Sequence, residues 1–189
     1  HIDLIRHHFE PAQAIRQRLM AQHGELLNQK PVSLHVRRGD YIQFSQHHPP
    51  LPISYYQDAL SRFASDRVVM VFSDDIAWCK TQFNWDYLTV FVTTQSEVDD
   101  LFLMSFCADH IIANSSFSWW GAWLNPSPTK TVICPSPWFG PAKSDISTID
   151  LIPADWQSLT YTISLQKSKM ESLCRRIAQP FRFVSQLMK

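Results

Sequence analysis

Residues 33–42 read SLHVRRGDYI, an alternation of apolar and polar residues that ends in charged residues and a glycine. This period of two predicts a β-strand over residues 32–37, in which His35 and Arg37 point to the same face. Arg38 should then point to the opposite face, where we expect it to fasten the following turn to a neighbouring carboxylate. We therefore expect Arg37 to contact a ligand and Arg38 to support the backbone.

The RRGD segment itself allows three interpretations. The planar guanidinium of arginine suits a diphosphate, and Gly39 would let the backbone approach a ligand or turn tightly. A lone RRGD is also typical of a surface turn with an ion pair. A cell-adhesion RGD is disfavoured, because the end of a buried strand would hide it.

Strands and helices alternate along the rest of the chain. The pattern predicts strands at residues 32–37, 68–72, 88–92, 111–113 and 130–135, and helices at residues 11–29, 54–64, 76–83, 101–108 and 114–125. Capping boxes are predicted at Ser54 with Gln57 and at Ser96 with Asp99. This alternation is typical of an α/β fold with a doubly wound parallel sheet, whose ligands bind beyond the carboxyl ends of the strands.

Composition limits the classes of function. The 189 residues can form one core or one lobe of a larger protein, and 17 basic residues balance 17 acidic ones, so no nucleic-acid partner is indicated. The four cysteines lack metal-site spacing and are interpreted as buried free thiols, which favours the cytoplasm. No apolar run is long enough to span a membrane, and no export signal is visible.

Asp74 and Asp75 directly follow a predicted strand. They could bind a divalent metal on a nucleotide, accept hydrogen bonds from a base or ribose, or cap the next helix. Capping explains one of them, but two adjacent carboxylates repel each other unless each has a partner.

The segment NSSFS, residues 114–118, precedes a predicted helix. Ser115, Ser116 and Ser118, together with free backbone N–H groups at the start of the helix, would form an uncharged cradle for phosphate. An ordinary helix cap is the alternative.

The segments HVRRGDY, VFSDDIAWCK and HIIANSSFSWWGAWLN, in this order, resemble glycosyltransferase family 11, the inverting alpha-1,2-fucosyltransferases that use GDP-fucose. The resemblance covers about residues 30–157. It implies the GT-B architecture of two Rossmann-like domains, of which this chain would be the nucleotide-binding, C-terminal half, with the first lobe missing. It also implies that no metal or other cofactor takes part.

The resemblance implies roles for individual residues. Arg37 would bind the β-phosphate of GDP and His35 the nucleoside, while Asp74, Asp75 or both would bind guanine or ribose. The diphosphate would be held by the turn that contains Asn114, Ser115, Ser116, Phe117 and Ser118. Asp40 is the nearest carboxylate and is assigned as the base that deprotonates the acceptor, although the base could also lie in the missing lobe.

The chain is expected to divide into a leading helix and interdomain segment (1–30), a GDP-sugar-binding domain (31–157) and a basic amphipathic tail (158–189). The tail would pack across the two lobes, contact a membrane surface peripherally, or form a solvated terminal helix. The implied acceptor is a galactose-containing glycan, and the implied location is the cytoplasm, at the inner membrane face in a bacterium, or the Golgi lumen in a eukaryote. The alternative is a non-catalytic nucleotide- or glycan-binding module.

Overall fold

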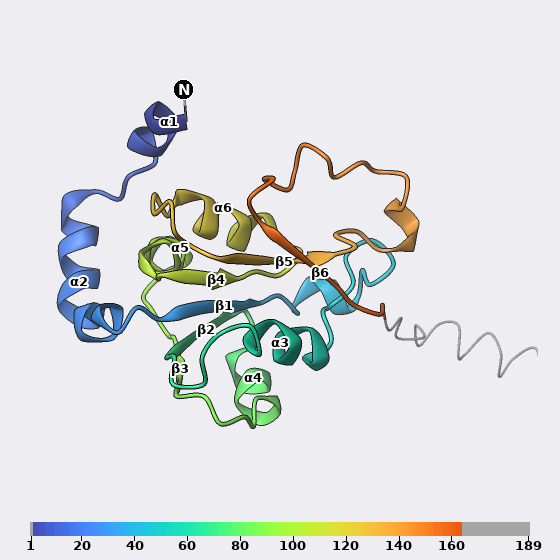
Figure 1. The fold of residues 1–189 in the computed structure, drawn as a ribbon, viewed down its shortest axis with the longest axis horizontal. Helices are drawn as coiled ribbons and strands as arrows, with labels where there is room; N and C mark the ends of the chain where they lie inside the picture. Colours follow the sequence, from blue (N-terminus) through green and yellow to red (C-terminus); the bar gives the residue numbers. More distant parts are fainter. Residues whose placement is uncertain (1, 164–189) are drawn as a thin grey trace, which may run out of the picture.

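The computed structural model describes residues 2–163, which fold around a six-stranded sheet. The strand order is β3-β2-β1-β4-β5-β6, and every neighbouring pair is parallel (Figure 1). The strands are β1 (Val32–Val36), β2 (Val69–Ser73), β3 (Thr89–Phe91), β4 (Asp109–Ile111), β5 (Val132–Ser136) and β6 (Gln157–Thr160). The predicted Rossmann-like, doubly wound α/β fold is confirmed.

Helices cover both faces of this sheet (Figure 1). The helices of the described chain are α1 (Ile2–His8), which projects away from the sheet, α2 (Gln13–Asn28), α3 (Ile53–Leu60), α4 (Ile76–Gln82), α5 (Glu97–Phe106) and α6 (Ser116–Leu124), with short 3-10 helices η1 (Asp40–Ile42) and η2 (Pro141–Lys143). Helices α3 and α4 pack on one face, where Tyr55 and Cys79 meet Leu34, and α2 and α5 pack on the other, where Leu19 and Leu103 are buried. Every residue of β1 is therefore buried, as expected for a central parallel strand.

Most predicted elements lie within a few residues of the observed ones, but some details were wrong. The predicted capping box at Ser54 is absent, because α3 begins one residue earlier, after Pro52, without a side-chain cap. The cap at Ser96 is confirmed, since its side chain accepts a hydrogen bond from the Asp99 backbone N–H. The sequence pattern did not predict α1 or β6, and β6 begins at the predicted domain end and runs into the predicted tail.

The connections leave β1 in two directions. The chain builds β2 and β3 on one side of β1 and then returns to place β4, β5 and β6 on the other side. Strands β1 and β4 therefore flank the point at which the winding reverses, and in such sheets ligands bind in the crevice beyond this point.

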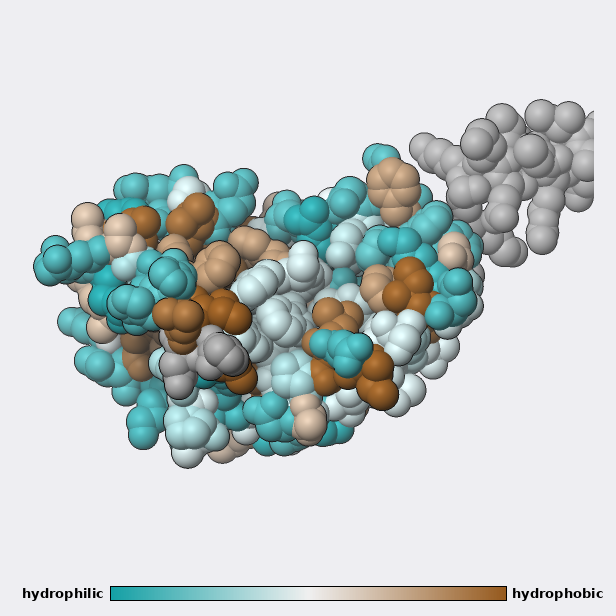
Figure 2. Space-filling view, turned by 90° about the horizontal axis from the view of Figure 1, so that it is seen from above, coloured by the Kyte–Doolittle hydropathy of each residue, from teal (hydrophilic) through white to brown (hydrophobic). Residues whose placement is uncertain are grey.

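Three of the cysteines, Cys79, Cys107 and Cys134, are buried free thiols as predicted. Cys174 and most of the predicted basic tail lie outside the described residues. Within residues 2–163, none of the helices combines the length and apolar character that crossing a bilayer requires. In the view from above, hydrophobic residues form separate patches among hydrophilic ones (Figure 2), so this face does not present one continuous apolar surface.

Candidate functional site

A cavity of about 650 Å³ opens at the carboxyl ends of β1, β2 and β3. Four segments line it: the end of β1, the turn from β2 into α4, the loop from β3 into α5, and the first turn of α6. The lining residues are His35, Arg37, Phe72, Ser73, Asp74, Ile76, Val92, Thr93, Thr94, Gln95, Ser96, Glu97, Asp100 and Phe117. The cavity therefore lies on the sheet edge where the sequence predicted a ligand site.

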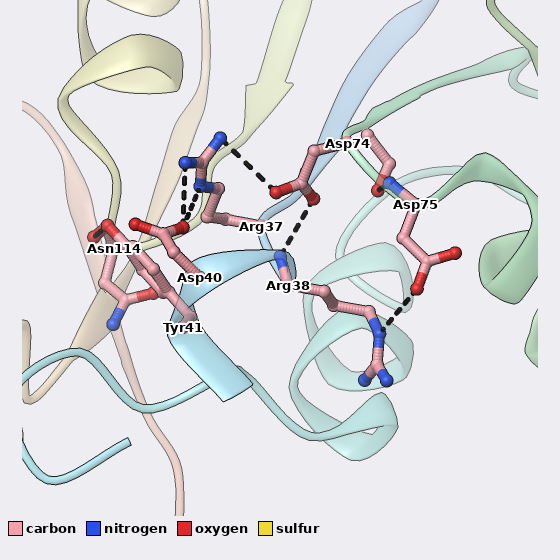
Figure 3. Close-up of polar contacts among 8 residues, drawn as sticks. Arg37, Arg38, Asp40, Tyr41, Asp74, Asp75 and Asn114 are labelled. Atoms are coloured by element: carbon pink, nitrogen blue, oxygen red, sulfur yellow. Dashed lines mark hydrogen bonds and ion pairs between the residues drawn. The ribbon is translucent and has the colours of Figure 1, made fainter. Parts of the chain in front are cut away.

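The two adjacent arginines point to opposite sides, as the strand period predicted (Figure 3). Arg37 lines the cavity. Arg38 turns away, so that its Nε lies 3.4 Å from Asp75 Oδ2 and its guanidinium lies 3.7 Å from the centre of the Trp78 ring. The supporting contact predicted for Arg38 is confirmed, and the ligand contact of Arg37 stays a prediction.

Two carboxylates hold Arg37 (Figure 3). Its Nη2 and Nε donate to Asp40 Oδ1 over 2.8 and 3.1 Å, and its Nη1 lies 3.3 Å from Asp74 Oδ2. The Tyr41 ring lies beside the guanidinium, 5.5 Å away. These contacts fix the guanidinium and neutralise it, so an anionic ligand has to replace at least one of the carboxylates.

Asp74 and Asp75 have different partners, which explains how adjacent carboxylates are tolerated. Asp74 Oδ1 accepts the backbone N–H of Arg38 over 2.9 Å. Asp75 caps α4, because its Oδ1 accepts the backbone N–H of Trp78 over 3.1 Å. The capping interpretation is correct for Asp75, which does not line the cavity, whereas Asp74 does.

The NSSFS segment contributes less to the cavity than predicted. Phe117 is its single residue among the lining residues. Ser116 is exposed, and the buried Ser118 hydroxyl donates to the backbone carbonyls of Ser115 and Ala113 over 3.3 and 3.4 Å. The serines of this segment therefore do not line this cavity, and their contact with a diphosphate stays a prediction.

Asn114 joins three loops instead of facing the cavity. Its buried Nδ2 donates to the carbonyls of Pro49, in the loop after η1, and Trp138, in the loop after β5, over 3.0 and 3.2 Å. The hydroxyl of Tyr41 donates to the Asn114 carbonyl over 3.0 Å. This arrangement connects the ends of β1, β4 and β5, so Asn114 supports the shape of the edge.

His35 forms part of the inner wall of the cavity. Its side chain is buried, its ring lies 5.5 Å from that of Phe117, and its Nδ1 has no hydrogen-bond partner among the described residues. Burial, assisted by the positive charge of Arg37, lowers the pKa of His35 to about 3. The imidazole is therefore neutral at pH 7 and can offer a hydrogen bond to a ligand.

The loop between β3 and α5 is a part of the site that the sequence pattern did not predict. There, Thr94 Oγ1 donates to Asp100 Oδ1 over 2.7 Å, and burial raises the pKa of the Asp100 carboxyl above its ordinary value. The neighbouring Asp99 accepts two hydrogen bonds from Arg18, over 2.8 and 2.9 Å, which fixes the first turn of α5. The predicted cap at Ser96 was the available signal, since it follows a strand end at this same edge.

No group of three or more histidine, cysteine, aspartate or glutamate side chains within residues 2–163 is placed to hold a metal ion. The cavity instead offers one guanidinium, Arg37, which is paired with Asp74 near the end of β1, and carboxylates, including Asp100, at the start of α5. Such a polarity suits a ligand with an anionic end and an end that donates hydrogen bonds.

Known proteins resemble this chain in sequence. Residues 2–145 match the model of glycosyl transferase family 11. The chain is 42% identical over 134 residues to the O-antigen biosynthesis glycosyltransferase WbnK of Escherichia coli. This match covers 65% of this chain and 44% of WbnK. It is 39% identical over 136 residues to an alpha-1,2-colitosyltransferase of Escherichia coli. This match covers 66% of this chain and 46% of the colitosyltransferase. The chain thus spans less than half the length of these two relatives.

Proposed function

The chain belongs to glycosyltransferase family 11, and from this premise we propose that it is the donor-binding half of an inverting alpha-1,2-fucosyltransferase. The donor would be GDP-fucose and the acceptor a hydroxyl of a terminal galactoside. The observation that carries the proposal is that the Arg37 guanidinium, after β1, and the Asp100 carboxylate, in the first turn of α5, line the same cavity. One of the two relatives is named for an alpha-1,2 transfer, which is the linkage proposed here.

Asp100 is suited to recognise guanine. A carboxylate accepts two parallel hydrogen bonds, and the adjacent N1–H and N2–H groups of guanine donate such a pair. Thr94 orients the carboxylate, and neutral His35 and Phe117 supply a ring-lined wall beside the nucleoside. Uracil and adenine do not present two adjacent ring and amino donors of this kind, so the site should prefer GDP to UDP and ADP.

Arg37 would receive the β-phosphate in place of Asp40. Of its two carboxylate partners, Asp40 is the more exposed, at 52% of its side chain against 25% for Asp74, so it is the more easily displaced. As the bond between fucosyl C1 and the phosphate oxygen breaks, its electron pair passes to the β-phosphate, where Arg37 stabilises the growing charge. The transfer then needs no metal at this position.

The acceptor hydroxyl attacks C1 from the opposite side and loses a proton. Asp40, which is not among the lining residues of the cavity, is assigned as the base that takes that proton once it is released from Arg37; a base in the first lobe is the alternative. The remaining length of the relatives leaves room for a first lobe that would hold the acceptor, giving the GT-B architecture. Binding of the donor would in this way prepare both the leaving group and the base.

The direct test is the nucleotide preference of the purified chain. Isothermal calorimetry with GDP, GDP-fucose, UDP and ADP should show the tightest binding for the two guanine nucleotides, with EDTA making no difference. Replacement of Asp100 by Asn should remove the preference for guanine. Equal affinity for all four nucleotides would refute the donor assignment.

The partial coverage of the relatives favours a second candidate, a non-catalytic GDP-sugar-binding module. The same titration distinguishes it when followed by a release assay. A catalytic site should slowly hydrolyse GDP-fucose and lose that activity in an Arg37→Ala variant, whereas a binding module should leave the donor intact over the same period.

A further inference from the structure

A second polar cavity, of about 240 Å³, lies at the carboxyl end of β5. It is formed by the segment after β5, drawn in orange, which extends past the strand ends and returns to β6 (Figure 1). Ser136, Trp138, Lys143, Ser144 and Thr148 are among its walls. It shares no lining residue with the cavity that contains Arg37, so it is a separate site on the same edge of the sheet.

Lys143 gives this cavity a positive charge without a counter-ion. Its Nζ lies 3.0 Å from His48 Nε2 and 5.6 Å from the centre of the Phe139 ring. Within residues 2–163, Lys143 forms no ion pair, and the cavity lining contains neither aspartate nor glutamate. Burial, together with the charge of Lys143, lowers the pKa of His48, so this ring accepts from the ammonium group as a neutral imidazole.

Three residues that carry hydroxyl groups line the same cavity. They are Ser136, Ser144 and Thr148, of which Ser144 is exposed, and none of their hydroxyls forms a hydrogen bond with another described residue. An ammonium group and free hydroxyls, with no acid beside them, can donate together to the oxygens of one anion. The cavity therefore has the donor set of a phosphate or carboxylate site.

A row of three aromatic rings connects this cavity with Arg37. The Tyr41 ring lies 5.5 Å from the Arg37 guanidinium and 5.1 Å from the His48 ring. The His48 ring lies 5.7 Å from that of Phe139, beside which Lys143 sits. The two cations are thus held at opposite ends of one packed row, which fixes the second cavity relative to the reacting phosphate.

We propose that the cavity around Lys143 binds an anionic group, phosphate or carboxylate, that the saccharide acceptor carries. The proposal rests on the proposed function only in naming the acceptor as the source of the anion. Binding there would anchor the acceptor on the edge of the sheet beside the donor, on the side of β5. A phosphate would come from a phosphorylated glycan and a carboxylate from an acidic sugar.

The test is a calorimetric titration of the purified chain, saturated with GDP, with three probes: galactose 1-phosphate, galacturonate and galactose. We expect at least one anionic probe to bind about tenfold or more tightly than galactose, since a hydrogen bond to a charged group is worth that much. The tighter of the two anions identifies the source. Equal binding of all three probes, or displacement of the anion by GDP, would overturn the proposal.

Variants separate this site from the donor cavity. Lys143→Met should lower the affinity for the anionic probe about tenfold or more and leave the affinity for GDP unchanged. Lys143→Arg should retain most of the affinity for the anionic probe. Lys80→Met is the matched control, because Lys80 is exposed on α4 and also lies near a ring, 5.9 Å from that of Phe91. Unchanged anion binding in Lys143→Met would overturn the proposal.

Two further measurements keep the result interpretable. If Lys143→Met does not fold, Thr148→Val can be used instead, because it removes the hydroxyl of a lining residue. This variant should lower the affinity for the anionic probe severalfold, and an unchanged affinity would count against the site. If the chain binds no GDP, the proposed function fails. The same titration without nucleotide then still decides whether the anion site exists.

Discussion

Gly39 and Asp74 lie so close together that a Cβ atom on residue 39 would be 2.6 Å from Asp74 Oδ2. This approach allows one carboxylate to accept the Arg38 backbone N–H over 2.9 Å while it pairs with Arg37 over 3.3 Å. The glycine of the RRGD segment therefore lets the acid at the end of β2 keep this position, because a Cβ atom there would force the Asp74 carboxylate to shift. It fixes the guanidinium that faces the cavity.

Replacement of Gly39 by Ala should weaken GDP binding. The added methyl group would displace the Asp74 carboxylate, and both its contact with Arg37 and its hydrogen bond from Arg38 would be lost or lengthened. We expect a loss of about 1–3 kcal/mol in binding free energy, measured by calorimetry.

Gly24→Ala is the matched control for this change. Gly24 lies inside α2, and a Cβ atom there would meet nothing within 4 Å. Alanine should raise the free energy of unfolding by about 0.8–1 kcal/mol, because it is the better helix former, and leave the GDP affinity unchanged. If both glycine variants bound GDP equally well, the role assigned to the contact between Gly39 and Asp74 would be wrong.

Alanine replacements of Arg37 and Arg38 should have opposite consequences. Arg37→Ala should raise the activation free energy of GDP-fucose turnover by about 2.7–4 kcal/mol, the usual effect of removing a hydrogen-bond donor to a developing oxyanion. The stability of the fold should change little. Arg38→Ala should mainly lower the free energy of unfolding, because it breaks the contacts with Asp75 and Trp78. Urea unfolding and GDP-fucose hydrolysis measure the two effects, and the reverse ranking would contradict the assignment.

The sequence predicted the directions of Arg37 and Arg38 because side-chain alternation in a strand is a local property. It failed for β6 for a related reason. This strand reads QSLT at the edge of the sheet, where most of its side chains are exposed, so it carries no apolar alternation. An edge strand of this kind is defined by its pairing with β5, which a local pattern does not reveal.

The partners of polar side chains were harder to predict than the elements. The residue type of Asn114 fits a ligand site and a structural link equally well, and its actual partners, Pro49 and Trp138, come from distant loops. Asp100 was not predicted as a site residue, because acidic residues are common in the first turn of a helix, where they interact favourably with the helix dipole. Only the convergence of four segments shows that it faces the same cavity as Arg37.

Asn114→Ala tests whether this residue links loops or binds the donor. Loss of its amide would leave the carbonyls of Pro49 and Trp138 without their donor, at a cost of about 1–3 kcal/mol in the free energy of unfolding. The GDP affinity should change far less than in Arg37→Ala. Ser116→Ala, at an exposed position of the same segment, should change stability by no more than about 0.5 kcal/mol. A loss of GDP affinity at unchanged stability would instead support the predicted donor contact of Asn114.

Two buried histidines should make the fold sensitive to mild acid. Burial lowers the pKa of His35 and of His110 to about 3 each, and the His110 ring is already engaged, with Nδ1 2.8 Å from Ser33 Oγ and Nε2 2.8 Å from Asn125 Nδ2. In the unfolded chain both would titrate near the ordinary value of about 6.5. Because the folded-state pKa is the lower one, the stability contributed by the neutral rings is complete above about pH 6.5 and is lost progressively as the pH falls below it.

The free energy of unfolding should therefore fall by up to about 1.4 kcal/mol per pH unit for each of these histidines below pH 6.5. Urea unfolding between pH 7 and pH 5 measures this slope before most carboxylates titrate. In the same range, the imidazole proton resonances of His35 and His110 should keep the chemical shifts of the neutral ring in the folded protein. A flat stability profile, or a folded-state resonance of either ring that titrates near pH 6.5, would show that the ring is not confined in its neutral form, and for His35 it would remove the neutral hydrogen-bonding wall assigned to the donor cavity.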